Sequence, residues 1–224
     1  MSTPPPQPVV VLVSGRGSNM RALVEQSREP ASGYEVVAVL SDHAGAGGLG
    51  AAQALGITST AIPFDAGAGR ARFEDRLSTA IDGHAPSLIV LAGFMRVLSA
   101  QFVDRYVGRI LNIHPSLLPK YPGLHTHRRV LAAADRVHGA TVHFVTAELD
   151  GGPRVIQARI AVLPDDDEDS LAARVQRQEH RIYPLAVNWH AQGRLRCRGG
   201  QAWLDGAVLA APVIVDPEPS GLEA

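Results

Sequence analysis

Five short apolar runs, separated by segments with helical patterning, make up most of the first half of the chain. They lie at residues 9–13, 34–40, 59–62, 87–91 and 110–113. Continuous runs rich in β-branched residues are typical of strands buried on both faces of a sheet, and their spacing leaves room for crossover helices. The pattern predicts an α/β fold: one doubly wound, mainly parallel sheet with helices on both faces.

The pattern changes after about residue 137. Two longer β-type runs, 137–145 and 154–162, flank a Gly-Gly-Pro turn and predict a hairpin that forms an antiparallel edge in the C-terminal half. A long helix is expected over residues 169–191, with the acidic run 165–169 as its solvated N-terminal end. Two short strands, near Leu195 and Trp203, should close the fold. The expected apolar stripe of the helix consists of Leu171, Val175, Ile182, Leu185 and Ala186.

The 224 residues suit a single domain, which we place at residues 9–206. Residues 1–8 contain four prolines and no apolar periodicity, and are expected to form a disordered leader. Residues 207–224 are expected to be a loose C-terminal tail.

Composition excludes several classes of protein. A formal net charge of -1 removes the bulk attraction with which general nucleic-acid binders capture phosphates. No apolar run approaches the roughly 20 residues that span a bilayer, and the N-terminus does not resemble a signal peptide. The single Cys197 cannot form an intramolecular disulfide. We therefore expect a cytoplasmic protein that binds neither nucleic acid nor membranes.

A glycine-rich turn follows the first predicted strand, with the sequence Ser-Gly-Arg-Gly-Ser-Asn at residues 14–19. At this position a parallel sheet presents backbone amides and a helix N-terminus to anions. The motif lacks the third glycine of a dinucleotide fingerprint and the Gly-Lys-Ser/Thr of a P-loop, so it favours a single phosphate. The alternative is a strand-to-helix turn whose glycines only satisfy backbone geometry.

Two polar side chains at the end of the fifth predicted strand are spaced to project to the same face. Asn112 can donate to a carbonyl oxygen that becomes negative, and His114 can transfer a proton near neutral pH. Asp150, in the predicted hairpin loop, is a candidate partner that would favour the charged imidazole. Without such contact, the alternative is that Asn112 and His114 are hydrogen-bonded caps of a strand end.

These segments resemble the 10-formyltetrahydrofolate-dependent phosphoribosylglycinamide formyltransferases. The resemblance rests on the glycine-rich turn and on LAGFMRVL at residues 91–98, NIHPSLLPKYPGLHTH at 112–127, HGATVHFV at 138–145, ELDGGP at 148–153 and QRQEH at 176–180. Together the motifs span most of residues 9–206. The departures are Arg16 inside the glycine turn, which we expect to point to solvent, and the extra leader and tail.

The resemblance implies transfer of a formyl group from 10-formyltetrahydrofolate, a co-substrate, to the amine of 5-phosphoribosylglycinamide in purine biosynthesis, with no metal and with a monomer or homodimer. It also assigns roles to individual residues. Asn112, His114 and Asp150 match the catalytic trio; Gly17, Ser18 and Asn19 match the phosphate loop; Glu179 matches a substrate contact; and Arg70, Met95, Arg96, Val97, Leu98 and Asn112 match the folate site.

Other interpretations of the same residues predict features that can be checked in the sequence. A methionyl-tRNA formyltransferase would be expected to carry an RNA-binding domain after the catalytic one, and a formyltetrahydrofolate hydrolase an N-terminal regulatory domain. A binding protein that had lost catalysis would be expected to lack one of the trio. For a metal site, the pair His125 and His127 has no convincing third ligand.

Overall fold

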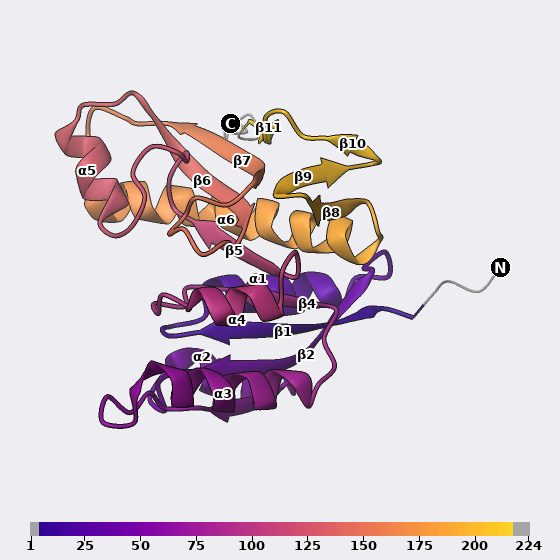
Figure 1. The fold of residues 1–224 in the computed structure, drawn as a ribbon. Coiled ribbons are helices and arrows are strands. Elements are labelled where there is room, and N and C mark those ends of the chain that lie inside the picture. The colour runs from indigo at the N-terminus through magenta and orange to yellow at the C-terminus, as the bar shows by residue number, and fades with distance from the viewer. Residues whose placement is uncertain (1–4, 217–224) are drawn as a thin grey trace.

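An eight-stranded sheet forms the centre of the structure, a computed structural model that describes residues 5–216 (Figure 1). The strand order is β11-β7-β6-β5-β4-β1-β2-β3. Within the described residues, β6 alone runs antiparallel to its neighbours in this sheet, β5 and β7. The strands are β1 (Gln7–Val13), β2 (Tyr34–Ser41), β3 (Thr58–Ala61), β4 (Leu88–Leu91), β5 (Ile110–His114), β6 (Val137–Phe144), β7 (Arg154–Ala161) and β11 (Val213–Val215).

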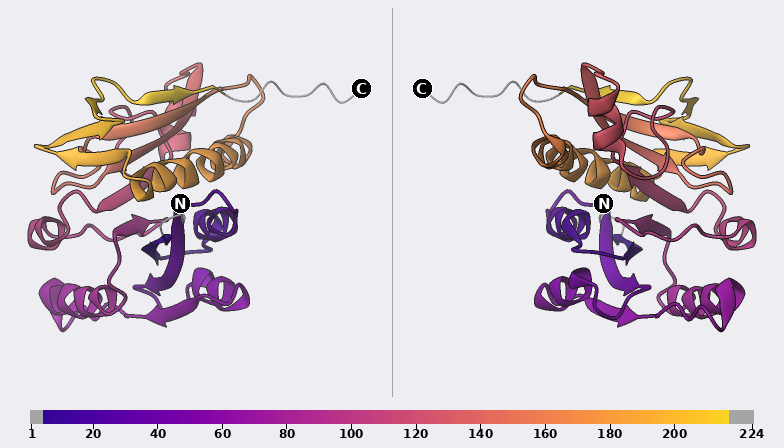
Figure 2. Two further views of the ribbon diagram at one scale, coloured as in Figure 1. Left: turned by 90° about the vertical axis from the view of Figure 1, so that its right-hand side faces the viewer. Right: turned by 90° about the vertical axis from the view of Figure 1, so that its left-hand side faces the viewer.

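Helices cover both faces of the sheet, which confirms the predicted fold class. Helices α1 (Ser18–Ser27), α2 (Gly47–Ala54) and α6 (Glu168–Ala191) pack on one face, with α5 (Thr126–Ala132) beside α6. Helices α3 (Gly69–Asp82) and α4 (Ala100–Arg105) pack on the other, as the side views in Figure 2 show. Side chains of β1 alternate between the two cores, with Val11 on the α1 side and Leu12 on the α3 side. This alternation explains why the strand is apolar at every position.

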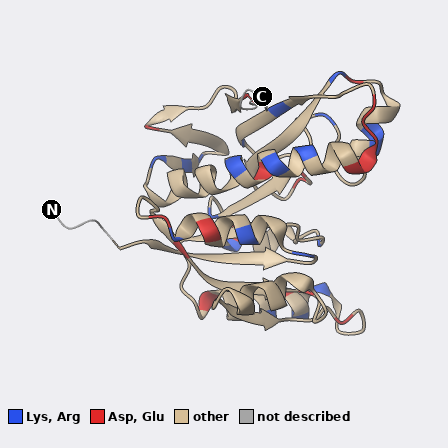
Figure 3. Ribbon diagram, turned by 180° about the vertical axis from the view of Figure 1, so that it is seen from behind, with Lys and Arg blue, Asp and Glu red and all other residues tan. Residues whose placement is uncertain are grey.

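The predicted hairpin and long helix are both present. The acidic run begins α6 as expected: Asp167 is its N-cap and accepts a hydrogen bond from the backbone N of Ser170 at 2.8 Å (red end of α6 in Figure 3). The predicted apolar stripe was wrong at Leu185, which is 38% exposed. Tyr183 and Trp189 instead join the buried face, since the sheet contacts a broader arc of the helix than the stripe assumed.

Both predicted termini need correction. The leader was expected to extend to residue 8, but Gln7 and Pro8 belong to β1, and the backbone N of Gln7 donates to the Gly33 carbonyl at 2.8 Å. Proline is tolerated at the start of a strand, where its missing N–H is not needed. Residues 1–4 lie outside the described residues.

The expected loose tail also forms strands. Residues 213–215 are β11, which pairs in parallel with residues 156–158 of β7 and covers the edge of the sheet. Residues 207–208 are β10, in a separate three-stranded antiparallel sheet with β8 (Leu195–Arg198) and β9 (Gln201–Leu204). Residues 217–224 of the predicted tail lie outside the described residues. Across residues 5–216, no helix has the length and apolar character needed to cross a bilayer.

The hydroxyl of Tyr183 ties α6 to the middle of the sheet. This fully buried side chain lies 2.9 Å from the carbonyl oxygen of Leu91 and 3.0 Å from that of Leu111. Tyr183→Phe should lower the free energy of unfolding by about 1–2 kcal/mol, because it removes a buried hydrogen bond. Urea unfolding measures this loss. Unfolding energy equal to wild type would show that the hydroxyl does not stabilise this contact.

His190, near the end of α6, predicts a loss of stability in acid. Burial lowers its pKa from 6.5 to about 4, and the positive charge of Arg196 acts in the same direction. The folded protein therefore favours the neutral ring, so this contribution is complete above about pH 6.5 and is lost as the pH falls towards 4. Between about pH 8 and pH 5, wild type should lose roughly 2 kcal/mol more unfolding free energy than His190→Gln. Urea unfolding at each pH measures this difference. Equal losses of unfolding free energy in wild type and His190→Gln would show that His190 does not cause the acid sensitivity.

Candidate active site

The glycine-rich turn lies between β1 and α1, at the carboxyl end of the parallel strands. Gly17 has a φ of 79°, and a Cβ there would come within 2.8 Å of the Gly48 Cα, so both the backbone angle and the close packing require glycine. Gly17 caps α1 without a side-chain hydrogen bond, which leaves the first amides of the helix to face an anion. Arg16 is exposed, as expected.

Helix α6 meets this turn through two hydrogen bonds. Gln176 Nε2 donates to Ser18 Oγ at 3.0 Å, and Asn19 Nδ2 donates to Glu179 Oε2 at 2.7 Å. Burial raises the pKa of Glu179, whereas the bond from Asn19 opposes that shift. The structure therefore brings Glu179 into one cluster with Ser18 and Asn19, although Glu179 lies 160 residues after Asn19 in the sequence.

The side chains of His114 and Asp150 meet where β5 and the β6–β7 loop come together, and His143 on β6 links them to Asn112. His114 Nδ1 lies 3.4 Å from Asp150 Oδ2, and both side chains are more than 90% buried. Asp150 has a φ of 53°, and its loop approaches β6 so closely that a Cβ on Gly152 would lie 1.8 Å from the Phe144 carbonyl oxygen. The contact that sequence spacing alone left open is therefore present.

Hydrogen-bond partners define the proton positions on two histidines. The carbonyls of Tyr121 and Phe144 can only accept, so His114 Nε2–H donates to the first at 2.9 Å and His143 Nδ1–H to the second at 2.9 Å. A second proton on His114 would lie on Nδ1, which faces Asp150 Oδ2 at 3.4 Å.

His143 is neutral and orients Asn112. Burial lowers the pKa of His143, and with a proton on Nδ1 its Nε2 accepts from Asn112 Nδ2 at 3.2 Å. This bond turns the Asn112 amide so that the second hydrogen on Nδ2 remains for another acceptor. The 3.8 Å contact from His143 Nε2 to Asp150 Oδ1 is then not an ion pair.

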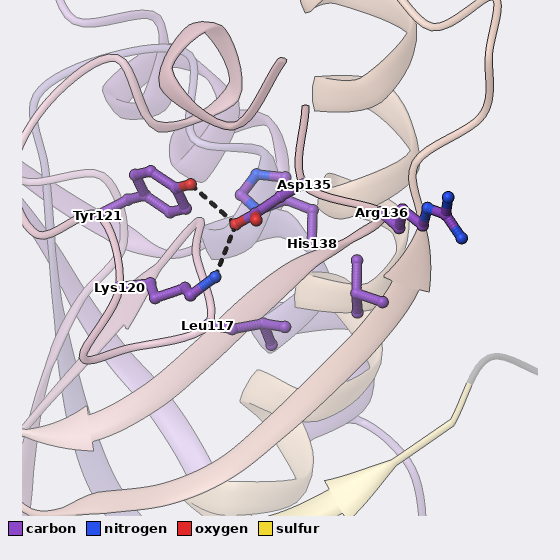
Figure 4. A pocket seen from close by; sticks show the side chains of 7 residues that line it. Leu117, Lys120, Tyr121, Asp135, Arg136 and His138 are labelled. Carbon is purple, nitrogen blue, oxygen red and sulfur yellow. Dashed lines mark hydrogen bonds and ion pairs between the residues drawn. The ribbon is translucent and has the colours of Figure 1, made fainter. Parts of the chain in front are cut away.

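The loop of residues 115–125 closes over His114 and is anchored at Asp135. Asp135 Oδ2 accepts from the Tyr121 hydroxyl at 2.8 Å and from Lys120 Nζ at 2.9 Å, beside a cavity of about 310 Å³ (Figure 4). The same loop donates from the Gly123 backbone N to Asp150 Oδ2 at 2.8 Å. It therefore contacts both members of the His–Asp pair.

The residues predicted to bind folate fall into two places. Residues 95–98 form part of the loop between β4 and α4, where Met95 and Val97 are more than half exposed and Leu98 is buried in the core on the α3 side. Arg70 is the second residue of α3 and lines a separate cavity of about 280 Å³ with Ser99 and Arg105. The lining of that cavity includes neither residues 95–98 nor the Asn–His–Asp trio.

The described residues contain no group of three His, Cys, Asp or Glu side chains that could hold a metal ion. His127 does not pair with His125; its Nδ1 lies 3.0 Å from His138 Nε2. Burial is the largest cause that lowers the pKa of both His127 and His138, the latter to about 4, so the two rings form a neutral hydrogen-bonded pair.

Comparison with known proteins decides the family. A family model described as formyl transferase matches residues 7–187. The phosphoribosylglycinamide formyltransferase of Escherichia coli strain K12 is 51% identical over 201 residues, which are 90% of this chain and 95% of that protein. The chain belongs to the phosphoribosylglycinamide formyltransferase family.

Solved structures agree with this placement. The phosphoribosylglycinamide formyltransferase of Coxiella burnetii matches with a TM-score of 0.89 and 46% identity, over 93% of this chain and 99% of that one. A formyltetrahydrofolate deformylase from Pseudomonas syringae matches with a TM-score of 0.81 but 22% identity, over 89% of this chain and 66% of that one. The second likeness shows a shared fold alone.

In this member of the formyltransferase family, two residues that contact the predicted site residues were not predicted from the sequence: His143 and Gln176. His143 lies opposite Asn112 in the pairing of β5 with β6, and Gln176 lies one helical turn before Glu179. Both lie inside motifs of the family, at residues 138–145 and 176–180. Their contacts depend on the register between β5 and β6 and on how α6 packs against the glycine turn. Gln176 could have been predicted from its spacing to Glu179, because residues three apart lie on the same face of a helix.

Proposed function

We propose that the protein transfers the formyl group of 10-formyltetrahydrofolate to the amine of 5-phosphoribosylglycinamide, a step of purine biosynthesis. The products are formylglycinamide ribonucleotide and tetrahydrofolate. The observation that carries the proposal is the meeting of His114 with Asp150 beside Asn112, in a family member whose glycine turn suits a single phosphate. We propose that it acts in the cytoplasm, as a monomer or homodimer.

The acceptor phosphate would bind at Gly17, Ser18 and Asn19. Backbone amides at the start of α1 and the partial positive charge of the helix end favour an anion there. Glu179, held by Asn19 at the same turn, would face the glycinamide part of the substrate. This arrangement would direct the acceptor amine from the phosphate turn towards Asn112.

The donor would occupy the opposite side of Asn112. Met95, Arg96, Val97 and Leu98 would line its pterin and aryl groups, and Arg70 is a candidate partner for its anionic end. The exposure of Met95 and Val97 supports this role, because both offer apolar surface, and the Met95 backbone N is bonded to Ser14 beside the glycine turn.

In the proposed reaction, the acceptor nitrogen attacks the formyl carbon and the carbonyl oxygen becomes an oxyanion. The free Nδ2 hydrogen of Asn112 and the protonated His114 ring would stabilise that charge, with the oxygen taking the place of the Tyr121 carbonyl at Nε2. Asp150 would balance the charge on His114 and organise a water molecule. The amine proton would move to N10 of the folate as the bond from N10 to the formyl carbon breaks.

The test is a spectrophotometric assay of the purified protein with 10-formyltetrahydrofolate, with and without 5-phosphoribosylglycinamide. Release of tetrahydrofolate that requires the ribonucleotide is expected. Release without it would identify a hydrolase, and no release in either condition would refute both reactions.

A further inference from the structure

Asp42 is a buried carboxylate that the proposed chemistry does not use. It directly follows β2, and its side chain is 7% exposed. Its Oδ1 accepts a hydrogen bond from Ser14 Oγ at 2.6 Å, and its Oδ2 forms an ion pair with Arg96 Nε at 2.6 Å. A carboxylate this deeply buried is costly unless both oxygens are paired, and here both are.

Arg96 is held on a second side by an aromatic ring. Its guanidinium carbon lies 3.8 Å from the centre of the Phe64 ring, and Phe64 packs edge-on against Phe73 at 5.6 Å. The Phe64 backbone N donates to the Asp42 carbonyl at 3.2 Å, so ring and carboxylate are part of one unit. The planar guanidinium is therefore fixed between the Asp42 carboxylate and an aromatic face.

The outer end of this guanidinium is open. The Arg96 side chain is 35% exposed, and its two terminal nitrogens form no hydrogen bond or ion pair with any other side chain or backbone group of residues 5–216. The ion pair with Asp42 and the contact with the Phe64 ring together restrict the orientation of the two Nη groups before a ligand arrives. A guanidinium presented in this way suits a planar carboxylate.

Ser14 connects the same unit to the glycine turn. Ser14 Oγ donates to Asp42 and accepts from the backbone N of Met95 at 2.9 Å, while the Ser14 backbone N donates to the Gly93 carbonyl at 3.0 Å. Ser14 immediately precedes the turn at residues 15–19. Asp42 therefore joins the turn to the loop that contains Met95 and Arg96.

We propose that Asp42 is a positioning residue for the donor: its ion pair with Arg96 holds the guanidinium so that both Nη groups face a carboxylate of the folate. This inference rests on the proposed function. The negative charges of 10-formyltetrahydrofolate are the carboxylates of its glutamate tail, so the ligand group is a carboxylate of that tail. Phe64 supports the orientation, and Ser14 transmits it to the position of Met95.

The first measurement compares Asp42→Asn with wild type in steady-state kinetics. Asparagine has nearly the same volume, but it carries no charge with which to hold Arg96. The KM for 10-formyltetrahydrofolate should rise about tenfold, whereas kcat and the KM for the ribonucleotide should stay within about twofold. Asp104→Asn is the matched control, because it removes the same charge from an exposed position on α4. An unchanged or lower donor KM in Asp42→Asn would overturn the proposal.

A second measurement separates positioning from general damage. Calorimetric titration with tetrahydrofolate and with tetrahydropteroate, which lacks the glutamate, gives the affinity loss in Asp42→Asn for each ligand. The loss should be about tenfold for the first and less than twofold for the second. Equal losses would show that the substitution disturbs the whole site and would refute the role. If wild type binds tetrahydrofolate but transfers no formyl group, the proposed function fails while this comparison still decides the role of Asp42.

Discussion

Asp150→Asn is expected to lower kcat by about 10²–10⁴-fold, with a much smaller effect on donor affinity. Asp150 Oδ2 lies 3.4 Å from His114 Nδ1, and an amide cannot balance the positive charge that the ring would carry while it stabilises the oxyanion. The backbone should be unaffected, since φ at this position is 53° and asparagine is among the residues that tolerate left-handed angles. Rapid-quench turnover and equilibrium binding of tetrahydrofolate measure the two effects separately.

Glu148→Gln is the control for this variant. It removes one negative charge from the same loop at an exposed position, and its kcat should match wild type. A kcat for Asp150→Asn within about threefold of that control would show that His114 does not need this carboxylate.

Asn112→Ala should lower kcat by about 10²–10³-fold, the usual effect of removing one donor to a developing oxyanion. Its Nδ2 is oriented by the bond to His143 Nε2, so the amide is fixed before the reaction and little reorganisation is needed. A burst experiment with both substrates should show that the chemical step is slowed, rather than product release.

Asn188→Ala is suitable for comparison, because it also removes a half-buried asparagine. Asn188 Oδ1 accepts from the Gly33 backbone N at 2.7 Å, so its loss should lower stability and leave kcat near the wild-type value. If the two alanine variants lose kcat equally, the effect of Asn112→Ala is structural and the oxyanion role is wrong.

The apolar runs predicted the order of the elements well, because strands buried on both faces need a continuous apolar sequence. The same reasoning failed at the C-terminal end. Residues 213–215 have the composition of a strand, but they follow a proline and precede an acidic segment, and only the free edge of β7 gives them a partner. Leu185 on α6 was also predicted wrongly. The sequence shows that the position is apolar, but it does not show which part of the helix surface the sheet covers.

Parts of the candidate site could be predicted from the sequence where a single segment forms them. The turn at residues 14–19 and the same-face pair Asn112 and His114 follow from the geometry of a strand end. Asp150 was a candidate from its loop, yet its contact with His114 rested on family resemblance. The sequence contained no comparable signal for Asp42, whose partners Ser14, Phe64 and Arg96 come from three other segments.

The sequence by itself therefore determined the fold class, the family and the residue types available for chemistry. These follow from periodicity and from motifs within single segments. Tertiary structure alone decided which imidazole nitrogen faces Asp150, how His143 turns the Asn112 amide, and how Asp42 holds Arg96. Each of these depends on contacts of about 3 Å between residues that are remote in the chain. Strand register and helix packing set such distances, and neither can be read from one segment at a time.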